Sequence, residues 1–378
     1  MAQEGDRLLI WGGYGHGNAG DWLTLAAALH DCGQAAGGVA TVLSPDPVMV
    51  EGLFPEARAV RYRLRRPRGL RGRVREALRR VGRSLRPVCW RFRYRLDDQM
   101  RDVAGDGPAE WVEALGQADR LYLAGGGYLT ELFDLERFVM PLLAAQRLGL
   151  AVETAPIGIG PFRTRAGEAL VADALRGARV VVRDDDSAAF CRRHGLPAVV
   201  RPDDGFRVRE VRPALAPPSA RAGHEPAKVG VCACPQYGAE APRRVQAWWG
   251  DLLCALRREL PAVALRGFCF HTDPTADYQC TREAFQRAGL ERSDVKPPRP
   301  GPWEAVEDVM ACDALATARF HAAVVAGVFG VPCLAVASGA YSRAKMESVR
   351  KVAPRTTRVV DPGRDAPADG AAALRGLL

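Results

Sequence analysis

The sequence predicts an α/β protein built from two doubly wound, Rossmann-like domains that face a cleft. Short apolar runs alternate with amphipathic helical segments along most of the 378-residue chain, which is the rhythm of parallel sheets covered by helices. Glycine and charged residues recur directly after the apolar runs, where open parallel sheets bind their ligands. The length favours two domains over one.

The first domain is expected over residues 1–212, and it opens with a short strand and a glycine-rich loop. The loop ends in Gly17-Asn18-Ala19-Gly20-Asp21, and we expect Asp21 to cap a helix over 22–32. The spacing of its glycines matches a dinucleotide fingerprint. That match is judged accidental, because the helix begins after the third glycine and no acidic residue ends the next strand. Bare backbone N–H groups can still approach a ligand in such a loop, so Asn18 and Asp21 are candidate site residues.

Later strands of this domain are also followed by glycine or charge. The residues that follow them are Gly125, Gly126 and Gly127 after strand 121–124, Gly158 to Pro161 after strand 151–156, and Arg183 after strand 179–182. Turns after strands need glycine for steric reasons alone. The three glycines at 125–127 are therefore cleft-loop candidates, and Arg183 is a candidate ligand for an anion.

An insertion rich in arginine spans about residues 58–101. It holds seventeen Arg, no Lys and three carboxylates, a local charge of +14 in a chain whose net charge is +9. From Leu70 to Leu85 the apolar residues recur at helical spacing among arginines, as in helices that lie on anionic membranes. Interleaved aromatic and Arg residues at 90–96 also allow base stacking. A solvated excursion or peripheral membrane contact is favoured over nucleic acid, and the role stays open.

A linker is expected at 213–227, where four prolines stand among small residues without periodicity. The second domain, 228–378, has expected strands at 229–233, 263–270, 314–317 and 332–336. His271 follows the second of them. Arg319 and His321 are expected in the first turn of a helix that Gly330 ends. A helix N-terminus favours a bound anion, so this stretch is the strongest candidate site.

Several classes of protein are disfavoured by composition. The chain is 48% hydrophobic and 26% charged, which is ordinary for a soluble globular protein. Its first residues resemble no secretory signal and no apolar run reaches spanning length unbroken, so a cytoplasmic protein with reduced thiols is expected. Cys232 and Cys234 form a C-x-C without a second ligand pair, so no metal site is expected.

The ordered set of motifs resembles the polysaccharide pyruvyl transferase family. The motifs that carry the resemblance are the 17–21 loop, the 125–127 glycines, Gly158 to Pro161, Arg183-Asp184 with Ser187, Asp203 to Phe206, and Arg319-Phe320-His321 before Gly330. The resemblance implies a fold similar to that of GT-B glycosyltransferases. It also implies transfer of the enolpyruvyl carbons of phosphoenolpyruvate onto two sugar hydroxyls, giving a cyclic pyruvate ketal and phosphate.

The residues suit that chemistry. Phosphoenolpyruvate carries a carboxylate and a phosphate, and Arg binds both groups through its fork of N–H donors, so Arg183 and Arg319 are the expected donor ligands. His321 matches the Arg-x-His of the family and is the expected acid/base. Arginines and helix N-termini can neutralise the charge, so no metal and no cofactor beyond the co-substrate are expected.

Two other functions stay open. A glycosyltransferase of similar shape would use a nucleotide sugar, with Glu347 as the obvious residue to hold a ribose. A non-catalytic protein would bind an anionic surface through the Arg-rich segment. The sequence also departs from the family at Trp22, at Asp204 and in the spacing of Tyr341 and Lys345. These changes concern the acceptor, which we expect to be a sugar or a lipid-linked glycan in cell-surface glycan biosynthesis.

Overall fold

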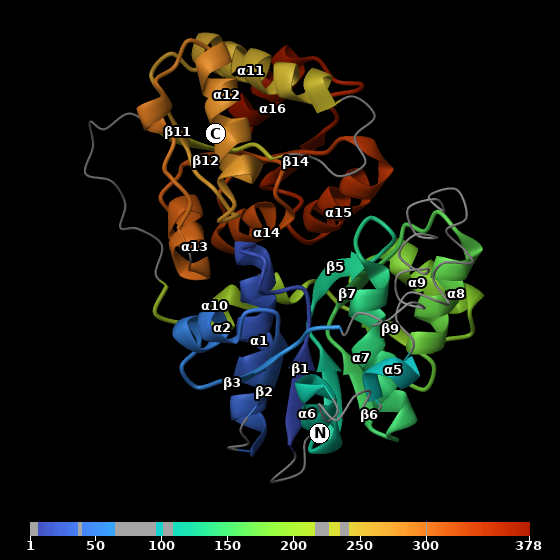
Figure 1. Cartoon of the computed structure of the whole chain (residues 1–378). Coiled ribbons are helices and arrows are strands. Elements are labelled where there is room, and N and C mark those ends of the chain that lie inside the picture. The colour runs from blue at the N-terminus through green and yellow to red at the C-terminus, as the bar shows by residue number, and fades with distance from the viewer. Residues whose placement is uncertain are drawn as a thin grey trace, which may run out of the picture. The chain divides into compact units, whose positions relative to one another are not determined.

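The computed structural model describes residues 7–36, 40–64, 96–100, 109–215, 227–234, 242–299 and 301–378 (Figure 1). The chain forms two compact units. Unit 1 consists of Met1–Gly15 and Thr24–Asp203, and unit 2 consists of His16–Leu23 and Asp204–Leu378. Each unit is a doubly wound α/β structure, which confirms the predicted fold class.

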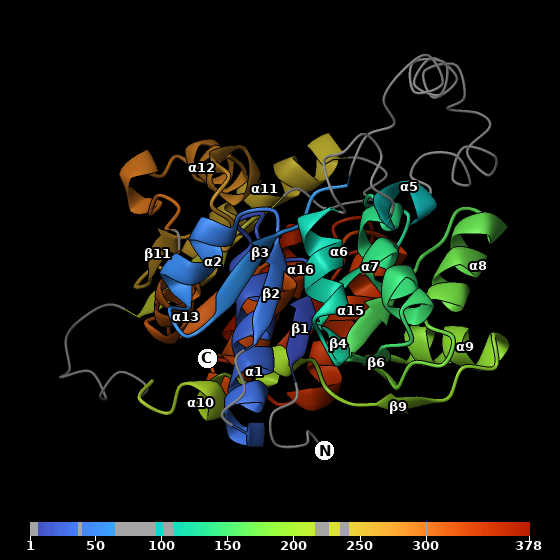
Figure 2. The ribbon, with the colours of Figure 1, turned by 60° about the horizontal axis from the view of Figure 1, so that its bottom comes forward.

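Unit 1 contains two parallel sheets. The larger has the order β3-β2-β1-β4-β6, which Figure 2 shows in succession; its strands are β1 (Leu8–Trp11), β2 (Thr41–Ser44), β3 (Arg58–Arg61), β4 (Arg120–Leu123) and β6 (Ala151–Thr154). The smaller has the order β5-β7-β8-β9; its strands are β5 (Gly126–Leu129), β7 (Ile157–Ile159), β8 (Val180–Val182) and β9 (Ala198–Val200). The strand order of the larger sheet reverses at β1, so the switch point of unit 1 lies between β1 and β4.

The helices of unit 1 pack on these sheets through aromatic side chains. They are α1 (Ala19–Ala36), whose first residues belong with unit 2, α2 (Pro47–Leu53), α5 (Leu96–Met100), α6 (Glu110–Gly116), α7 (Leu135–Arg147), α8 (Arg165–Ala174) and α9 (Asp185–Arg193). The Trp11 and Tyr62 rings pack at a tilt of 51° with centroids 4.2 Å apart, and the Trp11 indole donates to the Phe138 carbonyl at 3.1 Å. Tyr62 meets Trp111 edge-on at 5.3 Å. This cluster fixes α6 and α7 against the strands.

Unit 2 contains one parallel sheet of order β11-β10-β12-β13-β14. Its strands are β10 (Lys228–Cys232), β11 (Ala264–Gly267), β12 (Ala314–Thr317), β13 (Cys333–Val336) and β14 (Thr357–Val360). The central strands are buried on both faces, as expected when helices cover both sides. The order reverses at β10, which places the switch point of unit 2 between β10 and β12.

Two helical layers enclose that sheet (Figure 1). One layer holds α11 (Pro242–Glu259), α12 (Gln279–Arg287) and α16 (Pro367–Arg375); the other holds α13 (Pro302–Met310), α14 (Phe320–Phe329) and α15 (Gly339–Val352). Leu334 and Val336 point into the core of the first layer, while Cys333 and Ala335 point into that of the second. This alternation is the period of two expected for a strand.

The boundary between the units differs from the expected one at residue 212. The turn Asp204–Arg207 and the short helix α10 (Val208–Val211) belong to unit 2, where the turn packs against α14. The loop 16–23, expected in the first domain, also belongs to unit 2. The Phe206 ring of the turn lies close to Gly327 of α14, since a Cβ built on Gly327 would be 3.5 Å from this ring, an ordinary van der Waals distance.

Two expected segments lie largely outside the described residues. Of the Arg-rich insertion, the structure describes 58–64, which contains β3, and 96–100, which forms α5. The amphipathic helix predicted for 70–85 is not among the described residues, nor is most of the 213–227 linker. Within the described part of the chain, no helix has the length and apolar character needed to cross a membrane.

Candidate functional site at the switch point of unit 2

Arg319 stands between β12 and α14. Its backbone N–H donates to the Thr317 hydroxyl at 3.0 Å, and it forms the N-cap of α14, which Gly330 ends in the left-handed conformation at φ 72°. The structure thus begins this helix one residue after the predicted start and ends it at the predicted glycine. Among the described residues, the N-cap residue Arg319 makes no side-chain capping hydrogen bond to the first turn of α14, and the N-terminus of a helix favours a bound anion.

Arg319 forms an ion pair with Asp277, a residue that the sequence did not single out. The Nε of Arg319 donates to Oδ1 of Asp277 at 2.8 Å, and one terminal nitrogen donates to the same oxygen. Burial alone would lower the pKa of Arg319, but the Asp277 carboxylate more than offsets this and raises the pKa above its ordinary value. The guanidinium is therefore permanently charged.

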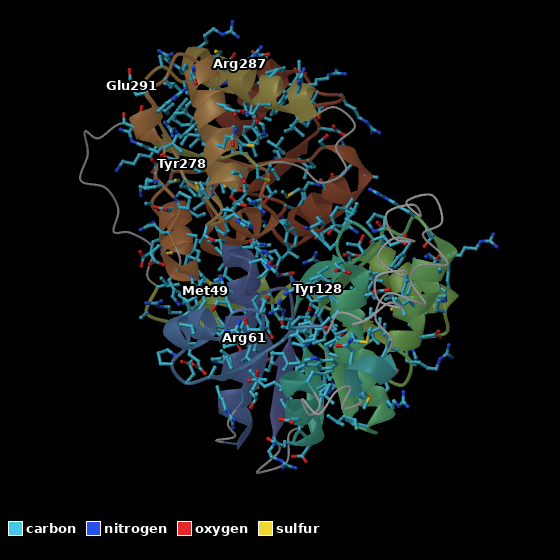
Figure 3. The ribbon with its side chains drawn as sticks, viewed as in Figure 1. Met49, Arg61, Tyr128, Tyr278, Arg287 and Glu291 are labelled. Atoms are coloured by element: carbon cyan, nitrogen blue, oxygen red, sulfur yellow. The ribbon has the colours of Figure 1, made fainter. Side chains whose placement is uncertain are left out.

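Asp277 is held from several sides at the switch point. It has no solvent exposure, and its Oδ2 accepts from the Phe270 N–H at 2.8 Å and from the Cys232 thiol, at the end of β10, at 3.6 Å. Asp277 stands in the helical turn Pro274–Tyr278 that leads into α12; Figure 3 labels Tyr278, the last residue of this turn. No sequence signal distinguishes it, since acidic residues are common in first turns of helices.

His321 lies in the first turn of α14 with 8% of its surface exposed. Gly20 packs directly on the imidazole: a Cβ built on Gly20 would lie 1.8 Å from Nδ1 of His321 and 2.3 Å from its Cγ. A side chain at position 20 would therefore displace the imidazole. This contact explains why the fourth position of the 17–21 motif is glycine.

The glycine loop is held in unit 2 by backbone pairing. Asn18 and His271 form an antiparallel bridge, in which Ala19 N–H donates to the Phe270 carbonyl and Thr272 N–H donates to the Gly17 carbonyl, both at 2.8 Å. Gly17 has φ 79°, and a Cβ there would meet the Thr272 hydroxyl at 1.8 Å. The loop that the sequence assigns to the first domain thus completes the edge of the unit 2 site.

Asp21 is presented to this site by Asn18, which corrects its predicted role as a helix cap. The helix begins at Ala19, so Asp21 lies in its first turn, and the amide of Asn18 donates to Asp21 at 3.0 Å while accepting from the Gly20 N–H at 3.1 Å. Burial raises the pKa of Asp21, although His321, Lys345, Asn18 and Arg319 each act to lower it. Burial and the nearby cationic groups thus act in opposite directions on the pKa of the Asp21 carboxyl.

His271 is half-buried beside the same loop. Its Nδ1 accepts from the Asp273 N–H at 3.0 Å, which assigns the ring proton of the neutral form to Nε2. Burial lowers the pKa of His271, and the nearby charge of Arg319 lowers it further. The ring is thus neutral near pH 7 and can donate one hydrogen bond from Nε2.

Lys345 adds a second cation from α15. Its ammonium lies 4.9 Å from the ring centroid of Tyr341 and 5.3 Å from that of Phe320. Stacking against two aromatic faces holds a flexible side chain near one position. The sequence treated these positions as a departure in spacing, yet the structure brings Lys345 into the electrostatic neighbourhood of Asp21.

Arg183 and the 125–127 glycines lie in unit 1. The Arg183 guanidinium donates to Asp203 at 2.7 Å with both side chains 2% exposed, and it packs against Gly158. A Cβ built on Gly125 would lie 3.3 Å from the Pro156 carbonyl oxygen. The Tyr128 hydroxyl donates to the Ala124 carbonyl at 2.5 Å. These residues shape the strand ends of unit 1. The buried ion pair favours a structural role for Arg183.

Comparisons with known proteins support the family and the fold. The family model described as polysaccharide pyruvyl transferase matches residues 18–339. S. aureus MnaA, in a co-structure with UDP, is 12% identical with a TM-score of 0.62, covering 98% of this chain and 87% of that one. A putative UDP-N-acetylglucosamine 2-epimerase from Listeria monocytogenes is 11% identical with a TM-score of 0.58, covering 100% and 89%. A search of curated proteins gave no significant match. At these identities the structural neighbours establish the fold alone, which is of the GT-B type.

Proposed function

The chain belongs to the polysaccharide pyruvyl transferase family, and from that premise we propose that it moves the enolpyruvyl group of phosphoenolpyruvate onto two hydroxyls of a sugar. The products are a cyclic pyruvate ketal and phosphate, and the acceptor is a sugar or lipid-linked glycan of the cell surface. One observation carries the proposal: Gly20, next to Asp21, packs directly on the imidazole of His321 in the first turn of α14, of which Arg319 is the N-cap.

Donor binding follows from the charges of the site. Phosphoenolpyruvate brings a carboxylate and a phosphate, and the site offers Arg319, Lys345 and the N-terminal turn of α14. Asp277 uses the Nε and one terminal nitrogen of Arg319, and the other terminal nitrogen makes no hydrogen bond within the described residues. That nitrogen can bind an anion while Asp277 holds the guanidinium in place.

The proton inventory of the reaction requires an acid and a base. One proton is added to C3 of the enol, each of the two acceptor hydroxyls loses one proton on attacking C2, and phosphate leaves as the second C–O bond forms. Two protons are thus released, one is consumed at C3, and the other leaves on phosphate. Histidine exchanges protons near neutral pH, and His321 is the imidazole next to Arg319, so we assign it this exchange.

Asp21 supports His321 in this scheme. A carboxyl whose pKa is raised by burial can share a proton with a nearby imidazole more readily than an ordinary Asp. Asn18 fixes the carboxylate through its amide, and Gly20 fixes the imidazole by contact. The 17–21 motif thus positions both proton-exchanging groups, and we assign Asn18 and Gly20 as positioning residues.

The nucleotide-sugar alternative receives less support from the site. Its candidate for holding a ribose, Glu347, pairs with Arg350 of the same helix at 2.6 Å. Such i,i+3 pairs are ordinary features of a helix surface.

The test is phosphate release from phosphoenolpyruvate by the purified chain, with and without a panel of glycosides and lipid-linked sugars. Product analysis must find pyruvate attached through two oxygens. We expect His321→Ala to lower acceptor-dependent release by about 10²–10⁴-fold. His194→Ala, which removes a surface imidazole paired with Glu168 in unit 1, is the matched control and should retain wild-type turnover. Full turnover by a folded His321→Ala protein would refute the assignment.

A further inference from the structure

A second basic site lies in unit 1, apart from the groups assigned above. A hollow of about 430 Å³ opens at the carboxyl ends of β2 and β3 and is closed by the first turn of α7. Its lining includes Pro45, Arg61, Tyr62, Arg63, Asp134 and Arg137. Arg61, at the end of β3, is labelled in Figure 3. The volume falls in the range of small-molecule sites.

The charge of this hollow is strongly one-sided. Three guanidinium groups line it against one carboxylate, Asp134. Within the described part of the chain, the Arg61 guanidinium makes one long hydrogen bond, to the Pro45 carbonyl at 3.4 Å. Among the residues that the structure describes, no carboxylate lies within ion-pair distance of Arg61, Arg63 or Arg137. Cations gathered in one concavity repel each other, so the arrangement is stabilised when an anion binds.

Of the three arginines that line the hollow, Arg137 has the environment that most favours a bound anion. Its side chain is half-buried, and burial lowers its pKa, although Tyr62 and Asp134 act to raise it. The guanidinium lies 6.0 Å from the Phe138 ring centroid. A cation withdrawn from water costs free energy unless a partner compensates it, and an anionic ligand in the hollow would supply that partner.

The floor of the hollow is rigid, as a binding site requires. Tyr62 is 3% exposed, its hydroxyl donates to the Arg137 carbonyl at 2.7 Å, and its ring is held by Trp11 and Trp111. This hydrogen bond ties the end of β3 to the first turn of α7. The three arginines are therefore presented from two elements that cannot move independently.

We propose that this hollow binds the diphosphate group of a phosphorylated small molecule or lipid. Guanidinium forks match phosphate oxygens bidentately, and three cations against one carboxylate suit a ligand with more than one negative charge. The concave shape favours a discrete group over an extended nucleic acid backbone. The proposal goes beyond the pyruvyl transfer proposed for unit 2 and does not depend on it.

The test is calorimetric titration of the full chain with inorganic pyrophosphate at fixed ionic strength. We expect Arg137→Gln to weaken binding about tenfold or more. Arg147→Gln, in the last turn of the same helix, makes the same change of charge outside the hollow and should stay within about twofold of the wild type. Arg319→Gln reports any pyrophosphate held at the unit 2 site, so the two sites are read separately. Equal affinities of Arg137→Gln and Arg147→Gln would overturn the proposal.

Two further titrations identify the kind of molecule that carries the diphosphate group. UDP and farnesyl diphosphate in detergent micelles are titrated beside pyrophosphate. Tighter binding of the prenyl compound that is lost in Arg137→Gln supports a lipid-linked ligand, and tighter binding of UDP supports a nucleotide. Binding of none of the three below millimolar concentration would refute the site. If Arg137→Gln does not fold, the exposed pair Arg61→Gln with Arg63→Gln replaces it.

Discussion

Among the described residues, each unit pairs an arginine with a buried aspartate near the carboxyl end of a strand, and the two pairs differ in how far the arginine is exposed. In unit 1, Arg183 and Asp203 are each 2% exposed. In unit 2, Arg319 keeps 14% of its side chain exposed while Asp277 has none. The same two residue types thus build a closed structural element in one unit and a supported, reachable cation in the other. Both arginines stand in sequence motifs, so the exposed fraction of the arginine side chain is what distinguishes the two pairs.

The largest expected effect comes from a substitution that breaks the buried Arg183–Asp203 ion pair of unit 1. Asp203→Asn removes the near carboxylate from the buried Arg183 guanidinium, leaves the carboxylate of Asp184 at 3.9 Å, and should lower the free energy of unfolding by about 3–5 kcal/mol. Asp277→Asn should cost less, because Arg319 can turn its partly exposed guanidinium toward water. Denaturant titration of both variants measures the difference. A larger loss in Asp277→Asn would reverse the distinction between the pairs.

The second effect concerns the contact that shapes the open site. Gly20→Ala places a methyl group within 1.8 Å of the His321 ring and should lower turnover by about 10²-fold through displacement of the imidazole. Gly33→Ala, in the same helix with open space around it, should leave turnover unchanged and stabilise the fold by about 0.4–1 kcal/mol. Steady-state kinetics and thermal denaturation test both variants. Equal kinetics in the two proteins would contradict the assigned contact.

A third, smaller effect tests whether Arg319 acts as a fork. Arg319→Lys keeps the charge and loses the second terminal nitrogen, so we expect about a tenfold loss in kcat/KM for phosphoenolpyruvate. Arg350→Lys is the control, since Arg350 pairs with Glu347 on the surface of α15 in the same unit. An unaltered kcat/KM in Arg319→Lys would show that only charge matters there.

The smallest effect is a pH dependence of unit 2. Because the pKa of His271 is lowered in the folded state, the unfolded chain takes up this proton first as the pH falls below about 6.5. The stability that neutral His271 contributes is present above that pH and is lost on acidification through its folded pKa. His271→Asn should therefore show a shallower loss of unfolding free energy below pH 6.5. If the unfolding free energies of the wild type and His271→Asn fall in parallel as the pH is lowered, His271 makes no such contribution.

The sequence predicted the unit 2 helix and strands well because their signals are local. Strand 314–317 and the end of α14 at Gly330 follow from apolar runs and a left-handed glycine. Asp277 could not be identified, since its role depends on a neighbour far along the chain. The 16–23 loop belongs to unit 2 because its backbone pairs with residues 270–272. Such pairing produces no hydrophobic periodicity in the sequence, so it could not be predicted.

The placement of the 16–23 loop also constrains the order in which the protein is made. The ribosome synthesises Gly20 roughly 300 residues before His321, and at about 5–20 residues per second this delay lasts about 15–60 s. During most of that interval the unit 1 strands can pair, while residues 270–272, with which the loop pairs, have not yet been made. The acid/base role proposed for His321 thus becomes possible only late in synthesis, when the residues of the C-terminal half pack onto a loop that was translated first.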